Sequence, residues 1–555
     1  MIIDRTTKNR LVIFLFFDKD GIADRYIFRM LEDLRQDART ILTVVNGYAE
    51  AETRRKLEEH SDEVLYRPNV GFDLGGYRDG IFHLGFKTLG TYDEVILMNY
   101  TFFGPLKTFH TMFEEMAGHD VDFWGITKHH RIDDNPFKGR IPYDYFPEHL
   151  NSHFFALRKN FVRSWSWREF MINRKNPESY TDSITDYEAV FTKYFEDLGF
   201  VWEEYVHSDY LKEMNRAPFA YLAADLIRDS GCPIIKRRNF FGDYTVFLQN
   251  TAGENSVRAY EALKETGYDT DLIWDNILRL QDPAEIRQVM HFARYPSVKA
   301  TKHTFRAGEA CAVVFGGKER VLALAGSYLE SLKDDIPVFF EEGALTYAEK
   351  LSKAAELAAG FAHVLVLDPL GIPSFGDPKS SRASVLYGEL ESLIASRPFV
   401  GNVLDIFENE DRIGLMVPPL SVYGNYFENL GDGYAGRFDE AVKLARELGV
   451  SFPISDKNPP AYSLGGGFWA KSEVLKAAAE KLSGHGEADE LLAKIVLPYL
   501  FQAEGCLTAT LTGSRYAGTY ATNLDYAMRE NNKVVFERFG PDYFWSEIDK
   551  INKRD

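Results

Sequence analysis

The chain has 555 residues, of which 45% are hydrophobic and 14% aromatic, and its formal net charge is -19. Because single hydrophobic cores stop growing at about 250 to 300 residues, this length predicts two or three domains. The negative charge argues against a general nucleic-acid or anionic-membrane surface. We therefore expect no nucleic-acid partner, and a charged substrate has to be met by a local basic patch.

Cysteine usage and hydropathy indicate the compartment. Cys232, Cys311 and Cys506 lie far apart and are odd in number, which favours neither a disulfide framework nor a zinc site and fits a reducing cytoplasm. The apolar run at residues 11–17 lacks a following cleavage site, so it predicts a buried strand rather than a signal peptide. No run approaches the about 18 apolar residues of a membrane span. We expect a cytoplasmic protein, either soluble or peripheral at the inner face of the cell membrane.

Strands and helices alternate along the first part of the chain. The predicted strands span residues 11–17, 41–45, 63–66 and 94–98, and helical spacing covers 22–34, 50–60 and the segment after residue 80. This alternation predicts a mainly parallel sheet, which binds ligands outside the carboxyl ends of its strands. Those ends carry Asp18, Asn46, Asn69 and Asn99, so one cleft can collect them.

The most informative strand end is the stretch 69–80, NVGFDLGGYRDG. Gly71, Gly75 and Gly76 allow positive φ and a close approach to a ligand, and amides at the following helix start suit a diphosphate. Asp73 is an acid that a structural turn alone does not require. The spacing matches neither the dinucleotide nor the P-loop fingerprint. An ordinary tight turn with a solvated Asp73 is the alternative.

A second α/β pattern begins near residue 310 and echoes the first. Its strands are expected at 312–315, 337–340 and 363–367. Later segments correspond to segments of the first copy: 411–418 to 121–127, 466–471 to 152–158, and the helix 487–503 to 186–199. An internal duplication explains this better than the general likeness of α/β units. Between the copies, helical patterns without a glycine- or serine-rich linker predict a connector. The expected divisions are 1–215, a helical connector at 216–305, and 306–555.

Several motifs, taken in order, resemble one known family. They are NVGFDLGGY at 69–77, ILMNYTFFGPL at 96–106, DFWGIT at 122–127, HLNSHF at 149–154, GCPIIKRR at 231–238 and the segment 268–279, with looser matches at IGLMVPP (413–419) and GFWA (467–470). Together they are similar to the rhamnan synthesis protein F family. The resemblance implies an α/β fold with two GT-A-like, Rossmann-like glycosyltransferase domains, of which the second, lacking the Asp of the glycine turn, is degenerate.

The resemblance also implies a reaction. The expected donor is dTDP-L-rhamnose, and the expected acceptor is a growing cell-surface polysaccharide on a lipid-linked oligosaccharide, with contact to the membrane or to other polysaccharide synthesis proteins. One motif departs from the family, which often has Asn-Asp-Ser or Asn-Asp-Thr where this chain has Asn99, Tyr100 and Thr101. The carboxylate that would hold Mg²⁺ or Mn²⁺ is missing, so the need for a metal is open.

Sugar transfer through an oxocarbenium-like state needs a stabilised leaving diphosphate and a base for the acceptor hydroxyl. The glycine-turn amides suit the first task, and Lys236 and Arg237, with Arg238, add charge if they fold back over the cleft. A solvated basic face is the alternative for these three residues.

The resemblance places the base at the start of the helix predicted for 182–196. Asp186 or Glu188 can serve, and Glu188 is favoured because Asp186 suits an N-cap. On the acceptor side, Trp124, His153 and Phe154 are candidates for contact with the sugar, with core packing as the alternative.

Two classes of function remain at this point. The first is a sugar transferase, for rhamnose or for a different nucleotide sugar. The second is a non-catalytic scaffold or regulator of a polysaccharide synthesis complex, which the missing acid at position 100 and the degenerate second half suggest. The intact Asp73 and the pair Asp186 and Glu188 favour the enzyme.

Overall fold

The computed structural model describes residues 1–242, 252–374, 382–421, 426, 429–456, 459–485 and 488–540. The chain folds as two compact units, the first comprising Met1–Ile277 with Gln288–Met290 and the second Leu278–Arg287 with His291–Asp555. The segment 216–305, predicted as a connector, is therefore shared between them, because its residues up to 277 belong to the first unit.

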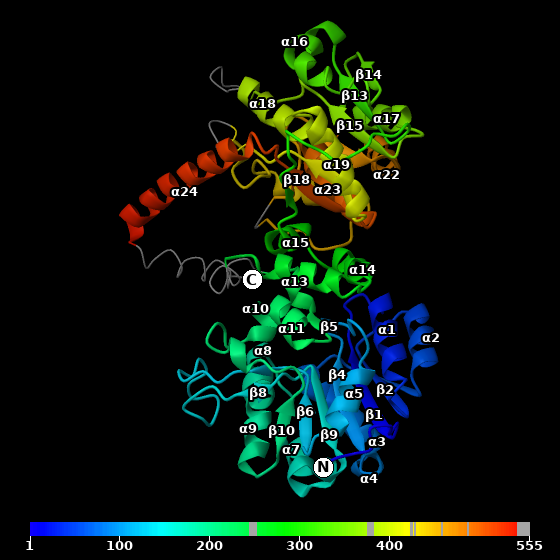
Figure 1. Ribbon diagram of the computed structural model, residues 1–555, viewed down its shortest axis with the longest axis vertical. Coiled ribbons are helices and arrows are strands. Elements are labelled where there is room, and N and C mark those ends of the chain that lie inside the picture. Colours follow the sequence, from blue (N-terminus) through cyan, green and yellow to red (C-terminus); the bar gives the residue numbers. More distant parts are fainter. Residues whose placement is uncertain are drawn as a thin grey trace. The chain divides into compact units, whose positions relative to one another are not determined.

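The first unit contains a seven-stranded sheet (Figure 1). Its strands are β1 (Arg10–Phe16), β2 (Thr40–Asn46), β3 (Glu63–Arg67), β4 (Glu94–Asn99), β6 (Phe123–Gly125), β9 (Phe154–Arg158) and β10 (Trp202–Glu204). Their order is β10-β6-β9-β4-β1-β2-β3. All neighbours are parallel except β9, which runs antiparallel to β4 and β6. The predicted α/β fold with a mainly parallel sheet is confirmed.

Helices and short two-stranded sheets complete this unit. The helices are α1 (Arg25–Leu34), α2 (Ala51–His60), α3 (Phe72–Leu84), α4 (Phe86–Leu89), α5 (His110–Ala117), α6 (Lys159–Arg163), α7 (Trp165–Asn173), α8 (Tyr180–Ser183), the π-helical η1 (Ile184–Glu188), α9 (Ala189–Asp197), η2 (Asp209–Leu211), α10 (Pro218–Tyr221), α11 (Ala223–Ser230), η3 (Arg237–Phe240), α13 (Asn255–Glu265) and α14 (Asp271–Leu280). The short strands pair as β5 (Phe102–Phe103) with β11 (Ile235–Lys236), and β7 (Lys128–His129) with β8 (His149–Leu150). Alternate residues of β1, such as Ile13, join one core cluster with side chains of α3, α7 and α9.

A buried ionic cluster joins four strands at the amino end of β4. The carboxylate of Glu94 accepts hydrogen bonds from Arg10 Nε of β1 at 2.9 Å and Trp124 Nε1 of β6 at 2.7 Å. Its Oε1 also lies 3.1 Å from Arg158 Nη1 of β9. None of the four side chains is more than 1% exposed. Because each buried charge depends on the others for compensation, the cluster holds β1, β4, β6 and β9 in one register.

The second unit repeats this topology. Its strands are β12 (Ala293–Arg294), β13 (Ala310–Phe315), β14 (Val338–Glu341), β15 (His363–Leu367), β16 (Ile413–Val417), β17 (Phe468–Lys471) and β18 (Leu507–Leu511). The run β18-β16-β17-β15-β13-β14 has the order of β10-β6-β9-β4-β1-β2, and β17 is antiparallel to both neighbours, as β9 is. Within the described residues β3 has no counterpart. The shared topology supports the internal duplication.

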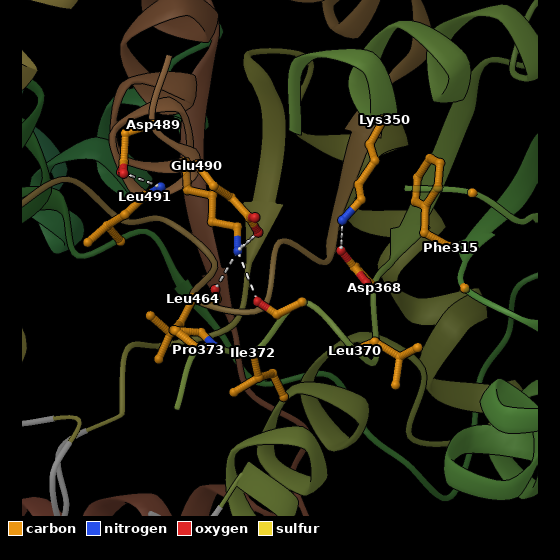
Figure 2. A pocket seen from close by; sticks show the side chains of 14 residues that line it. Phe315, Lys350, Asp368, Leu370, Ile372, Pro373, Leu464, Asp489, Glu490 and Leu491 are labelled. Carbon is orange, nitrogen blue, oxygen red and sulfur yellow. Dashed lines mark hydrogen bonds and ion pairs between the residues drawn. The ribbon is translucent and has the colours of Figure 1, made fainter. Parts of the chain in front are cut away.

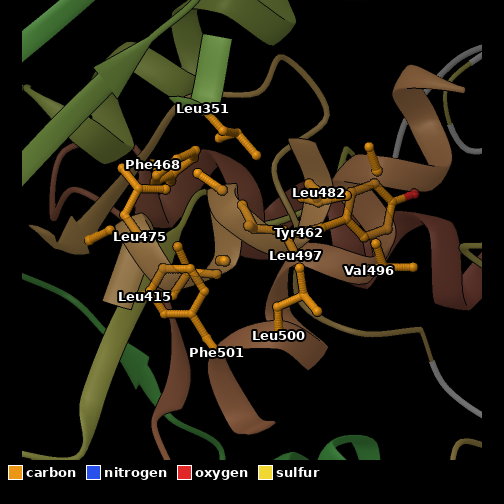
Figure 3. Close-up of a cluster of buried hydrophobic side chains, with 14 of the residues drawn as sticks. Leu351, Leu415, Tyr462, Phe468, Leu475, Leu482, Val496, Leu497, Leu500 and Phe501 are labelled. Atoms are coloured by element: carbon orange, nitrogen blue, oxygen red, sulfur yellow. The ribbon is translucent and has the colours of Figure 1, made fainter. Parts of the chain in front are cut away.

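The core of the second unit lies between its sheet and a set of apolar helices. The helices of this unit are α15 (Pro283–Met290), α16 (Lys318–Leu329), α17 (Tyr347–Leu357), α18 (Arg382–Leu393), α19 (Arg397–Asn409), α21 (Phe438–Glu447), α22 (Ser472–Ser483), α23 (Glu490–Ala503) and α24 (Ala517–Phe539). Figure 3 shows Leu351 of α17, Leu475 of α22 and Leu500 of α23 gathered around Leu415 and Phe468 of the sheet. These five side chains are fully buried, so this unit has a core of its own.

Replacing Glu94 with Gln tests the ionic cluster. The variant leaves the buried Arg158 without its carboxylate and leaves Arg10 only Asp37, at 3.8 Å, so we expect the free energy of unfolding to fall by about 3 to 5 kcal/mol. Glu59→Gln is the control, because Glu59 pairs with Arg55 on the surface and is 52% exposed. Urea unfolding followed by tryptophan fluorescence should show a large loss for Glu94→Gln and no measurable change for the control. Equal midpoints for both variants would contradict the role of the cluster.

Candidate functional site

The carboxyl ends of β1, β2 and β3 and the segment after β4 line one cavity, which we call the edge cavity. Its volume is about 630 Å³, and it is lined by Leu15, Phe17, Asn46, Asn69, Val70, Gly71, Phe72, Asp73, Tyr100, Asn176, Pro177 and Glu178. The structure thus brings together four of the predicted residues, Asn46, Asn69, Gly71 and Asp73. Asp18 is buried next to them, where its Oδ1 accepts hydrogen bonds from the amides of Asp20 at 2.9 Å and Ile22 at 3.1 Å.

A buried arginine that the sequence analysis did not identify holds the glycine turn. Arg67, the last residue of β3, donates from Nη2 to the carbonyl of Val70 at 2.9 Å and from Nη1 to Asn46 Oδ1 at 2.5 Å. Its Nε donates to Asp79 of α3. The guanidinium therefore fixes the turn to the strand end and to the helix. A basic residue at the end of a strand is too common for this role to be inferred from the sequence.

The three glycines of the turn differ in their roles. Gly71 precedes α3 with φ of 78°, and a Cβ there would lie 2.8 Å from Asn176 Cγ. Gly75 and Gly76 lie inside α3 without positive φ, which corrects the prediction that all three relax the backbone of the turn. A Cβ on Gly75 would lie 2.6 Å from the Val70 carbonyl, so these two glycines permit close packing of the helix.

Asp73 and Asn99 form a hydrogen-bonded pair at the base of the edge cavity. Asn99 Nδ2 donates to Asp73 Oδ2 at 2.7 Å, while Asn99 Oδ1 accepts from the amide and the hydroxyl of Thr101 at 3.0 and 2.7 Å. Asn99 is 1% exposed, so it positions Asp73 from beneath instead of lining the cavity. Burial raises the pKa of Asp73 to about 7, the charge of Glu188 adds to the rise, and hydrogen bonds from Asn99 and Ser152 oppose it.

Glu188 lies in a second cavity of the same unit, the Glu188 cavity, whose volume is about 280 Å³. Its lining includes the rings of His129, Phe137, Phe146, His149, Tyr180 and Phe219, together with Lys128, Asn151 and Lys236. Glu188 Oε1 accepts hydrogen bonds from Asn151 Nδ2 and the Ser152 amide, both at 3.3 Å. An acid held by donors inside an aromatic-lined cavity is a good arrangement for contact with a sugar hydroxyl.

The surroundings of Glu188 favour its ionised form. Burial opposes ionisation, but His149, Lys236 and the hydrogen bonds from Asn151 and Ser152 outweigh burial, so the pKa of Glu188 is lowered. Burial lowers the pKa of His149, which leaves that ring largely neutral at pH 7. Lys236 and the two hydrogen bonds are therefore the contributions that persist at neutral pH. Two acids whose pKa values are moved in opposite directions are typical of catalytic sites.

Asp186 does not share this position. It is exposed, whereas its neighbours Thr185 and Tyr187 are buried. The helical segment begins at Tyr180 and is capped by Ser179, whose side chain accepts from the Asp182 amide while Asp182 accepts from the Ser179 amide. The N-cap predicted for Asp186 is therefore wrong, because the helical segment starts at Tyr180 and Asp186 lies inside it instead of at its start.

The three basic residues of the predicted triplet lie beside these cavities. Lys236 lines the Glu188 cavity, and burial lowers its pKa although the charges of Glu188 and Asp73 act against the shift. The Arg237 guanidinium lies 5.6 Å from the ring centre of Tyr100, and its Nε donates to Asn276 Oδ1 at 3.0 Å. Arg238 lies over Tyr180 at 5.5 Å. The antiparallel pairing of β11 with β5, which the sequence patterns did not predict, brings the triplet to the cleft over which it was expected to fold back.

The aromatic acceptor candidates belong to the core. Trp124 and Phe154 are 0% exposed and pack on each other with ring centres 5.3 Å apart. This corrects the prediction that they contact an acceptor sugar, because a buried ring offers no free face. His153 is also buried and stacks on Phe219 at 4.8 Å, and burial lowers its pKa to about 3. Phe219, which lines the Glu188 cavity, is the ring that His153 supports.

Within the described residues, one group near this unit's sheet has the spacing of metal ligands. His130, Glu148 and Asp209 offer ligand atoms within 4.8 Å of one another. However, Lys128 Nζ lies 3.2 Å from Glu148 and 2.9 Å from Asp209, so an ammonium group already neutralises these acids. We therefore assign this group a structural role.

An α/β unit with ligand-sized cavities at the carboxyl edge of its sheet and two differently tuned acids has the features of a small-molecule site that is suited to acid–base chemistry. The chain belongs to the rhamnan synthesis protein F family, whose model matches residues 41–316 and 377–487. The resemblance seen in the sequence motifs is thereby confirmed. A curated relative, the uncharacterized protein y4gN of Sinorhizobium fredii, is 25% identical over 206 residues, covering 36% of this chain and 50% of that protein. The chain thus spans about half the length of this relative.

Solved structures show weaker likenesses. Core-mannan synthase A of Aspergillus fumigatus, in an Mn/GDP form, is 11% identical with a TM-score of 0.20, over 31% of this chain and 66% of that one. The glycosyltransferase GlyE of Streptococcus pneumoniae is also 11% identical, with a TM-score of 0.22 over 68% of this chain and 89% of that one. At these TM-scores neither structure positions individual residues of this chain.

Among the described residues, no helix has both the length and the apolar character needed to cross a bilayer.

The raised pKa of Asp73 predicts a pH-dependent stability. In the unfolded chain the pKa of an aspartate is about 4. Between about pH 4 and 7 the folded state therefore holds one proton more than the unfolded state, and its stability falls as the pH rises through this window. Asp73→Asn lacks this proton, so the stability of the variant relative to the parent should rise from pH 5 to pH 8. Thermal unfolding at a series of pH values measures the difference, and parallel curves for the two proteins would contradict the assignment.

Proposed function

We propose that the first unit is a glycosyltransferase that transfers L-rhamnose from dTDP-L-rhamnose to a growing cell-surface polysaccharide on a lipid-linked acceptor. The observation that carries the proposal is the pair of acids, Asp73 in the edge cavity and an ionised Glu188 in the neighbouring aromatic cavity, joined through Ser152. The family supports the choice of a rhamnan as product and thus of rhamnose as the sugar. A lipid-linked acceptor would bring the protein to the membrane surface.

The edge cavity suits the nucleotide part of the donor. No side chain caps the first turn of α3. The missing Cβ at Gly71 leaves room for the side chain of Asn176, which lines the same cavity. A diphosphate is stabilised by such unpaired amides at a helix start. Phe17 and Tyr100, which line the same cavity, offer aromatic surface on which the nucleobase can stack. We therefore place the diphosphate at Gly71 and the sugar next to Asp73.

The residues at this edge do not fit a divalent cation well. Mg²⁺ and Mn²⁺ prefer several hard oxygen ligands, of which carboxylates are the strongest. Both functional atoms of Asn99 are engaged by Asp73 and Thr101, and Tyr100 stands where the family often has an acid. Lys236 and Arg237 are among the cations that lie beside these cavities. We infer that these two side chains neutralise the leaving diphosphate, and no step is assigned to a metal ion.

Glu188 is proposed as the base. The acceptor hydroxyl attacks the anomeric carbon, its proton passes to the Glu188 carboxylate, and the bond from that carbon to the diphosphate oxygen breaks. The lowered pKa keeps Glu188 ready to accept a proton at pH 7. The rings of Phe137, Phe146 and Phe219 provide apolar faces for the acceptor sugar. The second unit is then a degenerate GT-A-like domain.

Glu188→Gln is the direct test of the base. General-base help is typically worth about 100-fold to 10,000-fold, so the variant should lose rhamnosyl transfer by that factor while donor affinity stays nearly unchanged. The matched control is Asp186→Asn, which alters an exposed acid two residues away and should transfer at the parent rate. Transfer to a synthetic rhamnoside and calorimetric titration with dTDP-L-rhamnose give the two readouts.

Equal transfer rates for Glu188→Gln and the parent would show that the base lies elsewhere. If the parent neither hydrolyses nor transfers any of a panel of dTDP, UDP and GDP sugars, the alternative of a non-catalytic scaffold is favoured instead. Turnover of a sugar other than rhamnose would keep the site and change only the donor.

A further inference from the structure

The second unit has its own cavity at the edge of its sheet that corresponds to the edge cavity of the first. Its volume is about 500 Å³, and it lies where the carboxyl ends of β13 and β15 and the segment after β14 meet the start of α23 (Figure 2). Phe315, Lys350, Asp368, Leu464, Leu491 and Lys494 are among the residues that line it. We call it the second-unit cavity. No part of the proposed transfer reaction uses it.

Two lysines in the lining of this cavity are held in place by contacts within the protein. Lys350 Nζ of α17 donates to Oδ2 of Asp368, the residue that follows β15, at 2.6 Å. Figure 2 shows this pair. Lys494 of α23 is 3% exposed and donates to the carbonyls of Leu464 at 2.9 Å and Gly371 at 3.2 Å. It also pairs with Glu490 at 2.7 Å. Because α23 is thereby tied to the loops before β17 and after β15, the cavity is pre-formed.

This charge pattern does not suit a diphosphate. Both lysines already have carboxylate partners, and with Asp489 the lining carries three acids against two cations. The backbone amides at the two helix starts near the cavity are also already capped by side chains. Asp489 Oδ1 accepts from the amides of Leu491 and Leu492, and Thr346 with Glu349 forms a capping box at the start of α17. An anion here would meet like charge and no unpaired helix amides, in contrast to the start of α3.

The lining does suit a neutral polyhydroxylated ligand. Phe315, Leu370, Ile372, Pro373, Leu464 and Leu491 supply apolar surface, and Asp368, Glu490 and the carbonyl groups supply hydrogen-bond acceptors. A sugar ring complements this lining, because its C–H faces are apolar and the hydroxyl groups around its rim donate hydrogen bonds. The volume lies within the range of about 300 to 1,000 Å³ that is usual for small-molecule sites.

We propose that the second-unit cavity binds a neutral segment of a glycan chain and does not bind nucleotide sugar. The duplicated domain has then kept its binding edge and exchanged a diphosphate site for a carbohydrate site. That the bound glycan is the acceptor or product chain rests on the proposed function, whereas the binding of a neutral glycan does not.

The test uses the full chain and oligosaccharides of known composition. Neutral tri- to hexasaccharides of L-rhamnose, D-mannose and D-glucose are titrated calorimetrically, and dTDP is titrated in parallel. Leu491→Trp fills the cavity and Glu490→Ala removes an exposed acceptor from it, so each should weaken oligosaccharide binding by about tenfold or more. Leu491→Trp should change neither the affinity for dTDP nor the rate of donor hydrolysis, whereas Glu490→Ala also removes the carboxylate partner of Lys494 and is compared for oligosaccharide binding.

Two variants serve as controls. Leu322→Trp adds an indole to an exposed position of α16 outside the cavity, and Asp73→Asn alters the first unit alone, so both should bind oligosaccharide as the parent does. The proposal is overturned if no oligosaccharide binds the parent at millimolar concentration, or if Leu491→Trp and Glu490→Ala bind it unchanged. It is also overturned if Leu491→Trp loses dTDP binding instead. Loss of transferase activity alone leaves the oligosaccharide result standing, so the two proposals fail separately.

Discussion

The buried carboxylate of Glu94 is the contact on which the first unit depends. It joins β1, β4, β6 and the antiparallel β9 at the edge of the sheet opposite to the cavities. Because β9 runs against its neighbours, the residues that precede it arrive at the carboxyl edge, where the ligand-binding ends of the parallel strands lie. Asn151 and Ser152 thereby come within reach of Glu188. The ion cluster and the site thus lie at opposite ends of the same strands.

The two acids at that site owe their different behaviour to their partners. Asp73 has a hydrogen bond from Asn99 but lies near a second carboxylate, so burial and repulsion keep its proton on up to about pH 7. Glu188 receives two hydrogen bonds and lies near Lys236, which favours its anion. Burial is the main cause of the raised pKa of Asp73, and if Glu188 is the base, the charge that this base keeps beside Asp73 adds to the rise.

Local patterns predicted the strands and the residues at their ends, because a buried parallel strand reads as a short apolar run and its carboxyl end follows directly. Asn46, Asn69, Gly71 and Asp73 line one cavity for that reason. What the patterns missed depends on contacts between distant segments. Arg67 acts through its bonds to a turn and a neighbouring strand. Lys236 was a candidate from the sequence, but the short strand pairing that brings it to the cavity was not predicted. Trp124 was misassigned because an aromatic ring in a strand looks the same whether it faces the core or a sugar.

We propose that nucleotide binding belongs to the edge cavity of the first unit and that the corresponding cavity of the second unit does not bind nucleotide. Unpaired amides at the start of α3 and capped amides at the start of α23 are the physical basis of this difference. A crystal structure of the full chain with dTDP tests it most directly. We expect the diphosphate to bind at Gly71 and the nucleobase to lie near Tyr100. A nucleotide bound between Lys350 and Lys494 would contradict it.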